Sequence, residues 1–166
     1  AQLFPAEENS GRLVALLRQQ AKAIAEAEGL DLILSDGPPG IGCPVISALS
    51  GANLAVIVTE PTVSGRHDLE RVLELCRHFK IPAGVIINKC DLNQDQAEGI
   101  EAFCQTHDLS LIGKLPHDMA FTEAMIQQLT ITEFSSNGTC EAVKAAWNNI
   151  LKLAVPKPAI EQSALG

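Results

Sequence analysis

The sequence predicts an α/β fold with three layers, α/β/α, built on a mostly parallel β-sheet. Short apolar runs alternate with segments of helical periodicity along the chain, as in strand–helix units joined by right-handed crossovers. The longest runs are continuous and do not alternate with polar residues, which favours strands covered on both faces. Loops rich in Gly, Pro or polar residues follow these runs, at the sheet edge where open α/β folds bind ligands.

The first part of the chain predicts a helix at residues 10–29, capped by Asn9 or Ser10 and ended by Gly29. A buried strand at 32–35 and a short helix at 44–49 follow. The apolar face of the first helix is expected at Leu13, Leu17, Ala21 and Ile24.

The middle of the chain predicts strands at 53–59, 82–87 and 109–115, with helices at 65–79 and 94–106 between them. Residues expected to point inward from these two helices are Leu69, Val72, Leu73, Cys76, Phe79, Ala97, Ile100 and Cys104.

Two further helices are predicted, one at 119–128 and a last one that begins at Asn137 or Thr139 and stops before Pro156. We therefore expect one domain over residues 1–155 and a disordered tail over residues 156–166. The apolar face of the last helix is expected at Val143, Ala146, Trp147, Ile150 and Ala154.

Composition argues against several classes of protein. The 166 residues carry a formal net charge of −8, which disfavours a protein that binds a nucleic-acid backbone. No apolar run approaches the roughly 20 residues of a membrane-spanning helix, and the first residues have neither a basic start nor an apolar signal core, so secretion is not expected. The five cysteines include no C-x-x-C pair, so neither a zinc nor an iron–sulfur site is indicated, and reduced thiols in the cytoplasm are expected.

The most informative stretch is residues 36–44, D-G-P-P-G-I-G-C-P, which follows the predicted strand at 32–35. Asp36 would lie at the carboxyl edge of the sheet, and the glycines let backbone N–H groups approach a ligand. A carboxylate beside backbone donors suits Mg²⁺ held through water, with Gly40 near a terminal phosphate. The alternative is a turn-forming Asp, because Asp-Gly is common in turns.

A second motif, N-K-C-D at residues 88–91, directly follows the predicted strand at 82–87. The Asn88 amide can bond to the edge of a purine base, and the Lys89 stem can pack over the ring. Asp91 can accept hydrogen bonds from ring nitrogens. The alternative is a polar turn that begins the next helix.

A third loop, G-K-L-P-H-D at residues 113–118, contributes Pro116 and Asp118 and would lie beside Asn88 at the same sheet edge. Its Gly-Lys pair is followed by Leu115, so it is not a phosphate-binding loop. The chain contains no G-x-x-x-x-G-K-[ST] sequence, and without it nucleotide phosphates lose most of their backbone cradle.

Several other polar residues have an ordinary structural interpretation. Cys43 would be reactive if its pKa were lowered beside a phosphate loop, but a small residue packed at a turn is the simpler interpretation. Glu60 either faces the site or belongs to the loop before a helix. The four histidines are scattered and are expected at the surface or at helix ends.

Taken together, these motifs resemble the MinD/ParA branch of the P-loop ATPases, within the CobQ/CobB/MinD/ParA nucleotide-binding domains. More narrowly, the chain is similar to the carboxyl-terminal part of MinD-type ATPases that carry an inserted ferredoxin domain. The match runs from residue 7 to residue 154. The segments that carry it are E-E-N-S-G-R-L-V at 7–14, D-G-P-P-G-I-G-C-P at 36–44, V-T-E-P-T at 58–62 with His67 and Asp68, I-N-K-C-D-L-N at 87–93 and G-K-L-P-H-D at 113–118.

The resemblance implies a P-loop NTPase-like fold that lacks its first strand and Walker A loop. In that family the Walker A loop and a ferredoxin-like insert with two [4Fe-4S] clusters precede a segment like this one. It further implies ATP and Mg²⁺ as cofactors, with Asp36 serving Mg²⁺ and Gly40 approaching the γ-phosphate. Arg12 stands where the family usually has Lys. The residues implied to surround the base are Asn88, Lys89, Asp91, Pro116 and Asp118.

The function implied by the resemblance is the nucleotide-binding part of a cytoplasmic ATP-dependent switch ATPase, linked to iron–sulfur or redox chemistry and not catalytic alone. The longer protein would form a homodimer with nucleotide at the interface and would meet a redox or iron–sulfur partner. Three alternatives stay open. They are a synthetase of the cobyrinic acid a,c-diamide synthase or dethiobiotin synthetase kind, a GTPase that uses N-K-x-D, and a non-catalytic module that docks a partner.

Overall fold

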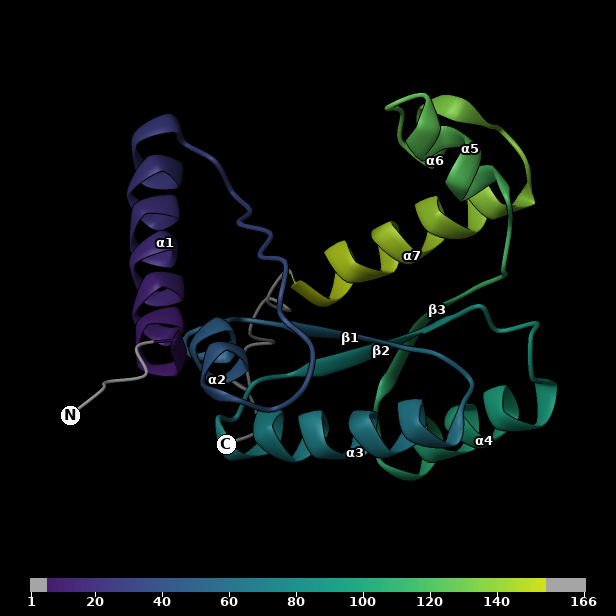
Figure 1. Cartoon of the computed structure of the whole chain (residues 1–166), viewed down its shortest axis with the longest axis horizontal. Helices are drawn as coiled ribbons and strands as arrows, with labels where there is room; N and C mark the ends of the chain where they lie inside the picture. The colour runs from purple at the N-terminus through teal and green to yellow at the C-terminus, as the bar shows by residue number, and fades with distance from the viewer. Residues whose placement is uncertain (1–5, 155–166) are drawn as a thin grey trace, which may run out of the picture. The chain divides into compact units, whose positions relative to one another are not determined.

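Helices and strands alternate through the middle of the chain in the computed structural model, which describes residues 6–154 (Figure 1). The predicted tail at 156–166 lies outside the described residues. The elements are α1 (Ala6–Glu28), α2 (Cys43–Leu49), β1 (Ala55–Thr59), α3 (Val63–His78), β2 (Ala83–Asn88), α4 (Gln94–Thr106), β3 (Ser110–Leu115), α5 (Ala120–Ile126), α6 (Ile131–Phe134) and α7 (Gly138–Ala154).

The strands form a parallel three-stranded sheet in the order β1-β2-β3. Strands β2 and β3 run in parallel from the pair Gly84 and Ser110 to the pair Asn88 and Leu115, with one irregularity between Val85 and Ile86. Helices flank the sheet, which confirms the predicted α/β class. Because neighbouring strands run the same way, the loops that leave β2 and β3 emerge at the same edge.

The described residues fall into two compact units. The first comprises the described residues up to Ala55 together with Ser64–Ala83, and the second comprises Val56–Val63 and the described residues from Gly84 onward. The first unit therefore contains α1, α2 and nearly all of α3, and the second contains most of the sheet with α4 to α7.

In the first unit, α1 packs against α2. The Arg18 guanidinium of α1 donates hydrogen bonds of 3.2 Å to the carbonyl oxygens of Ser47 and Ala48, and it also bonds to the carbonyl oxygen of Ser50. These carbonyls belong to the last turn of α2, where backbone acceptors have no helical partner. Gly29, with φ of +66°, ends α1 as predicted.

The predicted apolar face of α1 is largely uncovered. Leu13, Leu17 and Ile24 are each more than half exposed, and Ala21 is half-buried. Helical periodicity therefore identified the helix but not its start, because α1 begins at Ala6 and Asn9 and Ser10 lie within it. It also did not identify a buried face, because burial requires a partner that covers the apolar stripe.

The strand predicted at 32–35 does not form. These residues belong to no helix or strand, and Leu34 is 75% exposed. A β-strand needs a neighbour for its N–H and C=O groups, and within residues 6–154 the sheet contains only β1, β2 and β3. An apolar run predicts a tendency to be buried and cannot supply the neighbouring strand.

The core of the second unit lies where α7 packs on the sheet. Ile86, Ile112 and Ala146 form a buried cluster, and the Asn149 side chain of α7 donates a hydrogen bond of 2.9 Å to the Ile112 carbonyl oxygen. Gly113 permits this approach, because a Cβ there would lie 3.0 Å from the Ala146 Cβ. Helices α4 and α7 both contact β3, and they lie on either side of it in Figure 1.

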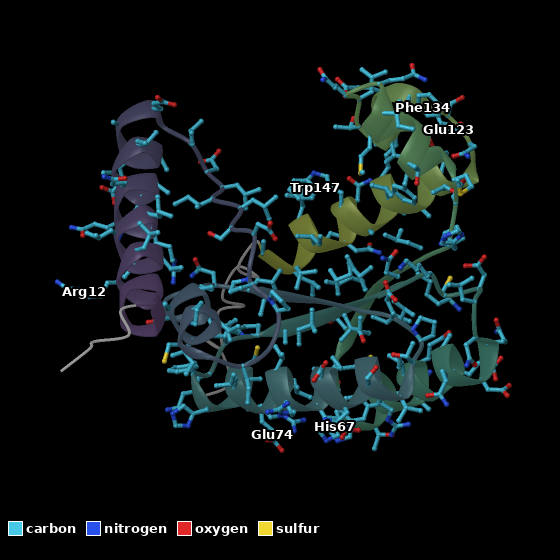
Figure 2. The ribbon with its side chains drawn as sticks, in the orientation of Figure 1. Arg12, His67, Glu74, Glu123, Phe134 and Trp147 are labelled. Atoms are coloured by element: carbon cyan, nitrogen blue, oxygen red, sulfur yellow. The ribbon has the colours of Figure 1, made fainter. Side chains whose placement is uncertain are left out.

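Most of the inward positions predicted for the helices at 65–79 and 94–106 are buried, whereas Ala146 alone is buried among those predicted for the last helix. The six predicted positions that are buried in the first two of these helices are Leu69, Leu73, Cys76, Ala97, Ile100 and Cys104. Phe79 and Trp147 are corrections, because they are 36% and 38% exposed. Phe79 follows the last residue of α3, and Figure 2 shows Trp147 on the side of α7 that faces away from the sheet.

Candidate functional site

The structure brings the loops after β2 and β3 together. Asn88, the last residue of β2, is in register with Leu115, the last residue of β3. Directly beyond this pair, the Cys90 N–H donates a hydrogen bond of 3.0 Å to the Leu115 carbonyl oxygen. The N-K-C-D motif and the loop at 115–118 are therefore neighbours at the carboxyl edge of the sheet, as the sequence predicts.

Lys89 is held by the loop after β1. Its Nζ lies 2.7 Å from Oε1 of Glu60, and both side chains are about half exposed. Lys89 also has φ of +52°, a left-handed conformation that costs energy for a residue with a Cβ. Glu60 thus faces this edge of the sheet, and the Lys89 ammonium group is engaged by the protein itself. A pair this exposed contributes about 0 to 1 kcal/mol.

Asp91 and Asp118 bond to the protein backbone and to side chains. Asp91 Oδ1 accepts a hydrogen bond of 2.6 Å from the His117 N–H. Asp118 Oδ1 accepts from the Ala120 N–H at 2.9 Å. Asp118 Oδ2 accepts from Thr139 Oγ1 at 2.6 Å and from Asn137 Nδ2 at 3.1 Å. The Thr139 hydroxyl, followed by the Ala120 N–H, lowers the pKa of Asp118, so that its carboxylate form is favoured.

Sequence reasoning missed the contact between Thr139 and Asp118. The two residues are separated by 21 positions, and the hydroxyl of Thr139 is brought to Asp118 by the start of α7. The available signal was the expectation that Asn137 or Thr139 begins the last helix. Asn137 does so, because its Oδ1 accepts a hydrogen bond of 3.1 Å from the Cys140 N–H.

Burial raises the pKa of the Cys90 thiol, and the neighbouring Asp91 carboxylate raises it further. Both effects disfavour the thiolate, which is the reactive form of cysteine. The Cys90 side chain is therefore a neutral thiol. Its backbone N–H connects the N-K-C-D loop to β3 through the hydrogen bond to Leu115.

The Asp36 loop lies in the first unit. Residues 31–40 are exposed, and Gly40 has φ of +87°, a conformation that favours glycine. A Cβ at Gly37 or Gly40 would meet no atom within 4 Å, so the space beside this backbone is open. Within the described residues, no group of three or more His, Cys, Asp or Glu side chains could hold a metal ion.

The Asp36 loop can supply only part of the ligands that a Mg²⁺ ion needs. Mg²⁺ in nucleotide sites usually keeps several waters and takes one or two carboxylates together with substrate phosphates. Asp36 is an exposed carboxylate beside an open glycine backbone, which suits the protein's part of such a set. Arg12 is exposed and projects away from α1 (Figure 2).

Comparison with known proteins gives relatives that include Nubp1 homologs and MinD proteins. No family model matches the chain. The cytosolic Fe-S cluster assembly factor Nubp1 homolog of Drosophila grimshawi is 31% identical over 143 residues, which cover 74% of this chain and 46% of that protein. The septum site-determining protein MinD of Bacillus subtilis is 24% identical over 170 residues, which cover 99% of this chain and 63% of MinD.

This chain is a relative of the MinD/ParA-type P-loop ATPases. Its fold agrees with solved MinD structures. The cell division ATPase MinD of Pyrococcus furiosus superposes with a TM-score of 0.69 at 20% identity, over 86% of this chain and 59% of MinD. MinD of Pyrococcus horikoshii, solved with Mg-ADP, superposes with a TM-score of 0.62 at 21% identity, over 72% of this chain and 49% of that chain.

A third solved structure is the MinC:MinD cell division protein complex of Aquifex aeolicus, with a TM-score of 0.70 at 20% identity, covering 87% of this chain and 62% of the matched chain. The chain thus spans less than two thirds of the length of each of these relatives. Within the described residues, no helix has the length and apolar character to cross a membrane.

Proposed function

We propose that this chain is the nucleotide-binding part of an ATP-dependent switch ATPase of the MinD/ParA type, and that it is not catalytic by itself. The observation that supports this most directly is the hydrogen-bonded junction of loops 88–91 and 115–118 at one sheet edge. An amide side chain and two partly exposed loops meet there, at the kind of edge where α/β folds bind ligands.

In this proposal the base lies against Asn88 and the loop that contains Pro116. Asn88 offers one amide acceptor and two donors, and it is half-buried. The His117 N–H is bonded to Asp91 and the Asp118 carboxylate to three protein donors. Lys89, Asp91 and Asp118 therefore shape the base site, and Asn88 with the loop backbone contacts the base.

Asp36 is the proposed magnesium residue, and Gly40 is the proposed neighbour of the γ-phosphate. Mg²⁺, when bound, would neutralise charge on the nucleotide phosphates. The Asp36 carboxylate would hold the ion through water, and the open backbone at Gly40 would let a phosphate approach. The solved MinD of Pyrococcus horikoshii with Mg-ADP supports this choice of cofactor.

The remaining phosphate contacts must come from a Walker A loop that this sequence lacks. We therefore propose that the chain acts within a longer protein that supplies this loop and forms an ATP-dependent homodimer. The partial coverage of the relatives supports this proposal, and the MinC:MinD complex shows that a relative assembles with other chains.

An iron–sulfur link is proposed for the longer protein alone. It is supported by the relative that is a cytosolic Fe-S cluster assembly factor and by the resemblance to ATPases with an inserted ferredoxin domain. The five cysteines of this chain include no C-x-x-C pair, so this chain is expected to purify without iron. Iron and sulfide analysis of the chain and of the longer protein tests this point.

Calorimetric titration with Mg-ATP and Mg-GTP tests the main proposal. The chain alone should bind Mg-ATP with a dissociation constant above about 1 mM, a free energy of only about −4 kcal/mol. The longer protein with a Walker A loop should bind Mg-ATP far more tightly and in preference to Mg-GTP. Tight binding by the chain alone would contradict the need for that loop, and no binding by either form would favour a docking module.

A further inference from the structure

The loop at 116–118 is held from two sides. On one side, Asp91 Oδ1 accepts a hydrogen bond from the His117 N–H. On the other side, the Asp118 carboxylate accepts from Thr139, Asn137 and Ala120. The loop is therefore bonded both to the N-K-C-D segment and to the first turn of α7.

Thr139 is suited to set the position of this loop. Its side chain is 6% exposed, and its hydroxyl makes the shortest of the three contacts to Asp118, at 2.6 Å. A buried hydroxyl that donates to a carboxylate is a charge-assisted hydrogen bond, which is shorter and stronger than a neutral one.

Helix α7 is in turn attached to the sheet. Ala146 is buried against the sheet, and Asn149 donates to the Ile112 carbonyl oxygen. The first turn of α7 is thus the end of an element that is packed on β3, and a contact from this turn places the loop relative to the strands. Asn88, at the end of β2, is positioned by the same sheet.

We propose that Thr139 is a positioning residue for nucleotide binding, because its hydroxyl holds Asp118 and so places the 116–118 backbone against the base site beside Asn88. This inference rests on the proposed function. In this role Thr139 does not contact the ligand, and the Asp118 carboxylate holds the loop in place.

Three variants test the contact itself in the 166-residue chain. Thr139→Val keeps the shape of the side chain and removes the hydroxyl, and Thr139→Ser keeps the hydroxyl. Thr122→Val is the matched control, because Thr122 is an exposed residue of α5. If Thr139→Val does not fold, Thr139→Ala serves in its place.

Nuclear magnetic resonance provides two measurements that need no ligand. In Thr139→Val, the amides of His117 and Ala120 should exchange with solvent up to about tenfold faster, the equivalent of one hydrogen bond. The pKa of Asp118 should rise toward its ordinary value, because its main lowering contact is lost. Thr139→Ser and Thr122→Val should leave both quantities as in the wild type. Unchanged exchange and an unchanged Asp118 pKa in folded Thr139→Val would overturn the inference.

A titration with Mg-ATP then tests the role in binding. The wild-type chain should show shifts at His117, and Thr139→Val should bind up to about tenfold more weakly while Thr139→Ser restores the affinity. Wild-type affinity in Thr139→Val would overturn the positioning role. If the wild-type chain and the longer protein bind no nucleotide, the proposed function and this role both fail, while the exchange and pKa measurements still decide whether Thr139 holds the loop.

Discussion

The contact between Gly84 and Ile112 offers a sharp test of how closely β2 packs against β3. An added Cβ at Gly84 would lie 2.6 Å from Cδ1 and 2.8 Å from Cγ1 of Ile112, and 3.2 Å from the Ser110 carbonyl oxygen. Carbon atoms pack best at about 3.5 to 4.0 Å, so the methyl group would be about 1 Å too close. Ile112 is 2% exposed and has little room to move.

Gly84→Ala should therefore destabilise the protein by about 1 to 3 kcal/mol, the usual cost of overpacking. Ile112→Ala should cost about 2 to 5 kcal/mol, because it removes a buried branched side chain. The double variant should be less destabilised than the sum of the two by about 0.5 to 3 kcal/mol, because the new methyl group occupies part of the vacated space.

Urea denaturation followed by circular dichroism measures these free energies. Gly138→Ala is the matched control, because a Cβ at Gly138 meets nothing within 4 Å and should change stability by no more than about 0.5 kcal/mol. A Gly84→Ala variant as stable as the control would refute the close packing of β2 on Ile112. Strict additivity in the double variant would refute the steric explanation.

Three further predictions concern the sites. Asp36→Ala in the longer protein should abolish Mg²⁺-dependent ATP hydrolysis without changing the circular dichroism spectrum, and unchanged turnover would exclude Asp36 as the magnesium residue. The pKa of Asp118 is lowered in the folded state, so the Asp118 carboxylate stabilises the folded protein fully at pH values above 3.8, the pKa of this group in the unfolded chain. This contribution to stability is lost as the pH falls through the lower pKa of the folded state. Urea stability should therefore decline below about pH 4, and Asp118→Asn should flatten this decline; an unaltered pH profile would contradict it. Iodoacetamide should modify the exposed Cys43 first and spare the buried Cys76, Cys104 and Cys140 until the protein unfolds, and equal labelling of all four in the folded protein would contradict the burial.

Residues close together in the sequence were sufficient to predict many of the helices and strands of the second unit. Helix α4 (Gln94–Thr106) has the predicted bounds, because Asn93 caps it through a hydrogen bond from the Gln96 N–H and its apolar positions recur at helical spacing. Strand β3 begins one residue after its predicted start. Each of these elements is specified by residues within or next to it.

Other features depend on partners distant in the sequence. The apolar run at 32–35 has strand character but no neighbouring strand in the described sheet, so its composition could not decide its structure. Helix α6 (Ile131–Phe134) was missed because it is a single turn, although Thr130 and Glu133 form a capping box there.

In the candidate site, too, some features could be predicted from local sequence and others depend on distant residues. The sequence placed loops 88–91 and 113–118 at one edge, because strand order along the chain and parallel pairing suffice for that inference. It did not reveal that Lys89 pairs with Glu60 or that Asp91 bonds to the His117 N–H. These contacts join loops from different strands, and motif matching reports residue types without reporting what each side chain already binds.

The most direct test of the central claim is a nuclear magnetic resonance titration of the chain with Mg-ATP. Amide shifts should move at Asn88, Cys90 and His117, and Asn88→Ala should abolish them, whereas Asn148→Ala, an exposed position on α7, should not. Absence of shifts at these amides up to about 10 mM Mg-ATP, where even a binding energy of about −3 kcal/mol is detectable, would contradict a nucleotide site at the β2–β3 edge.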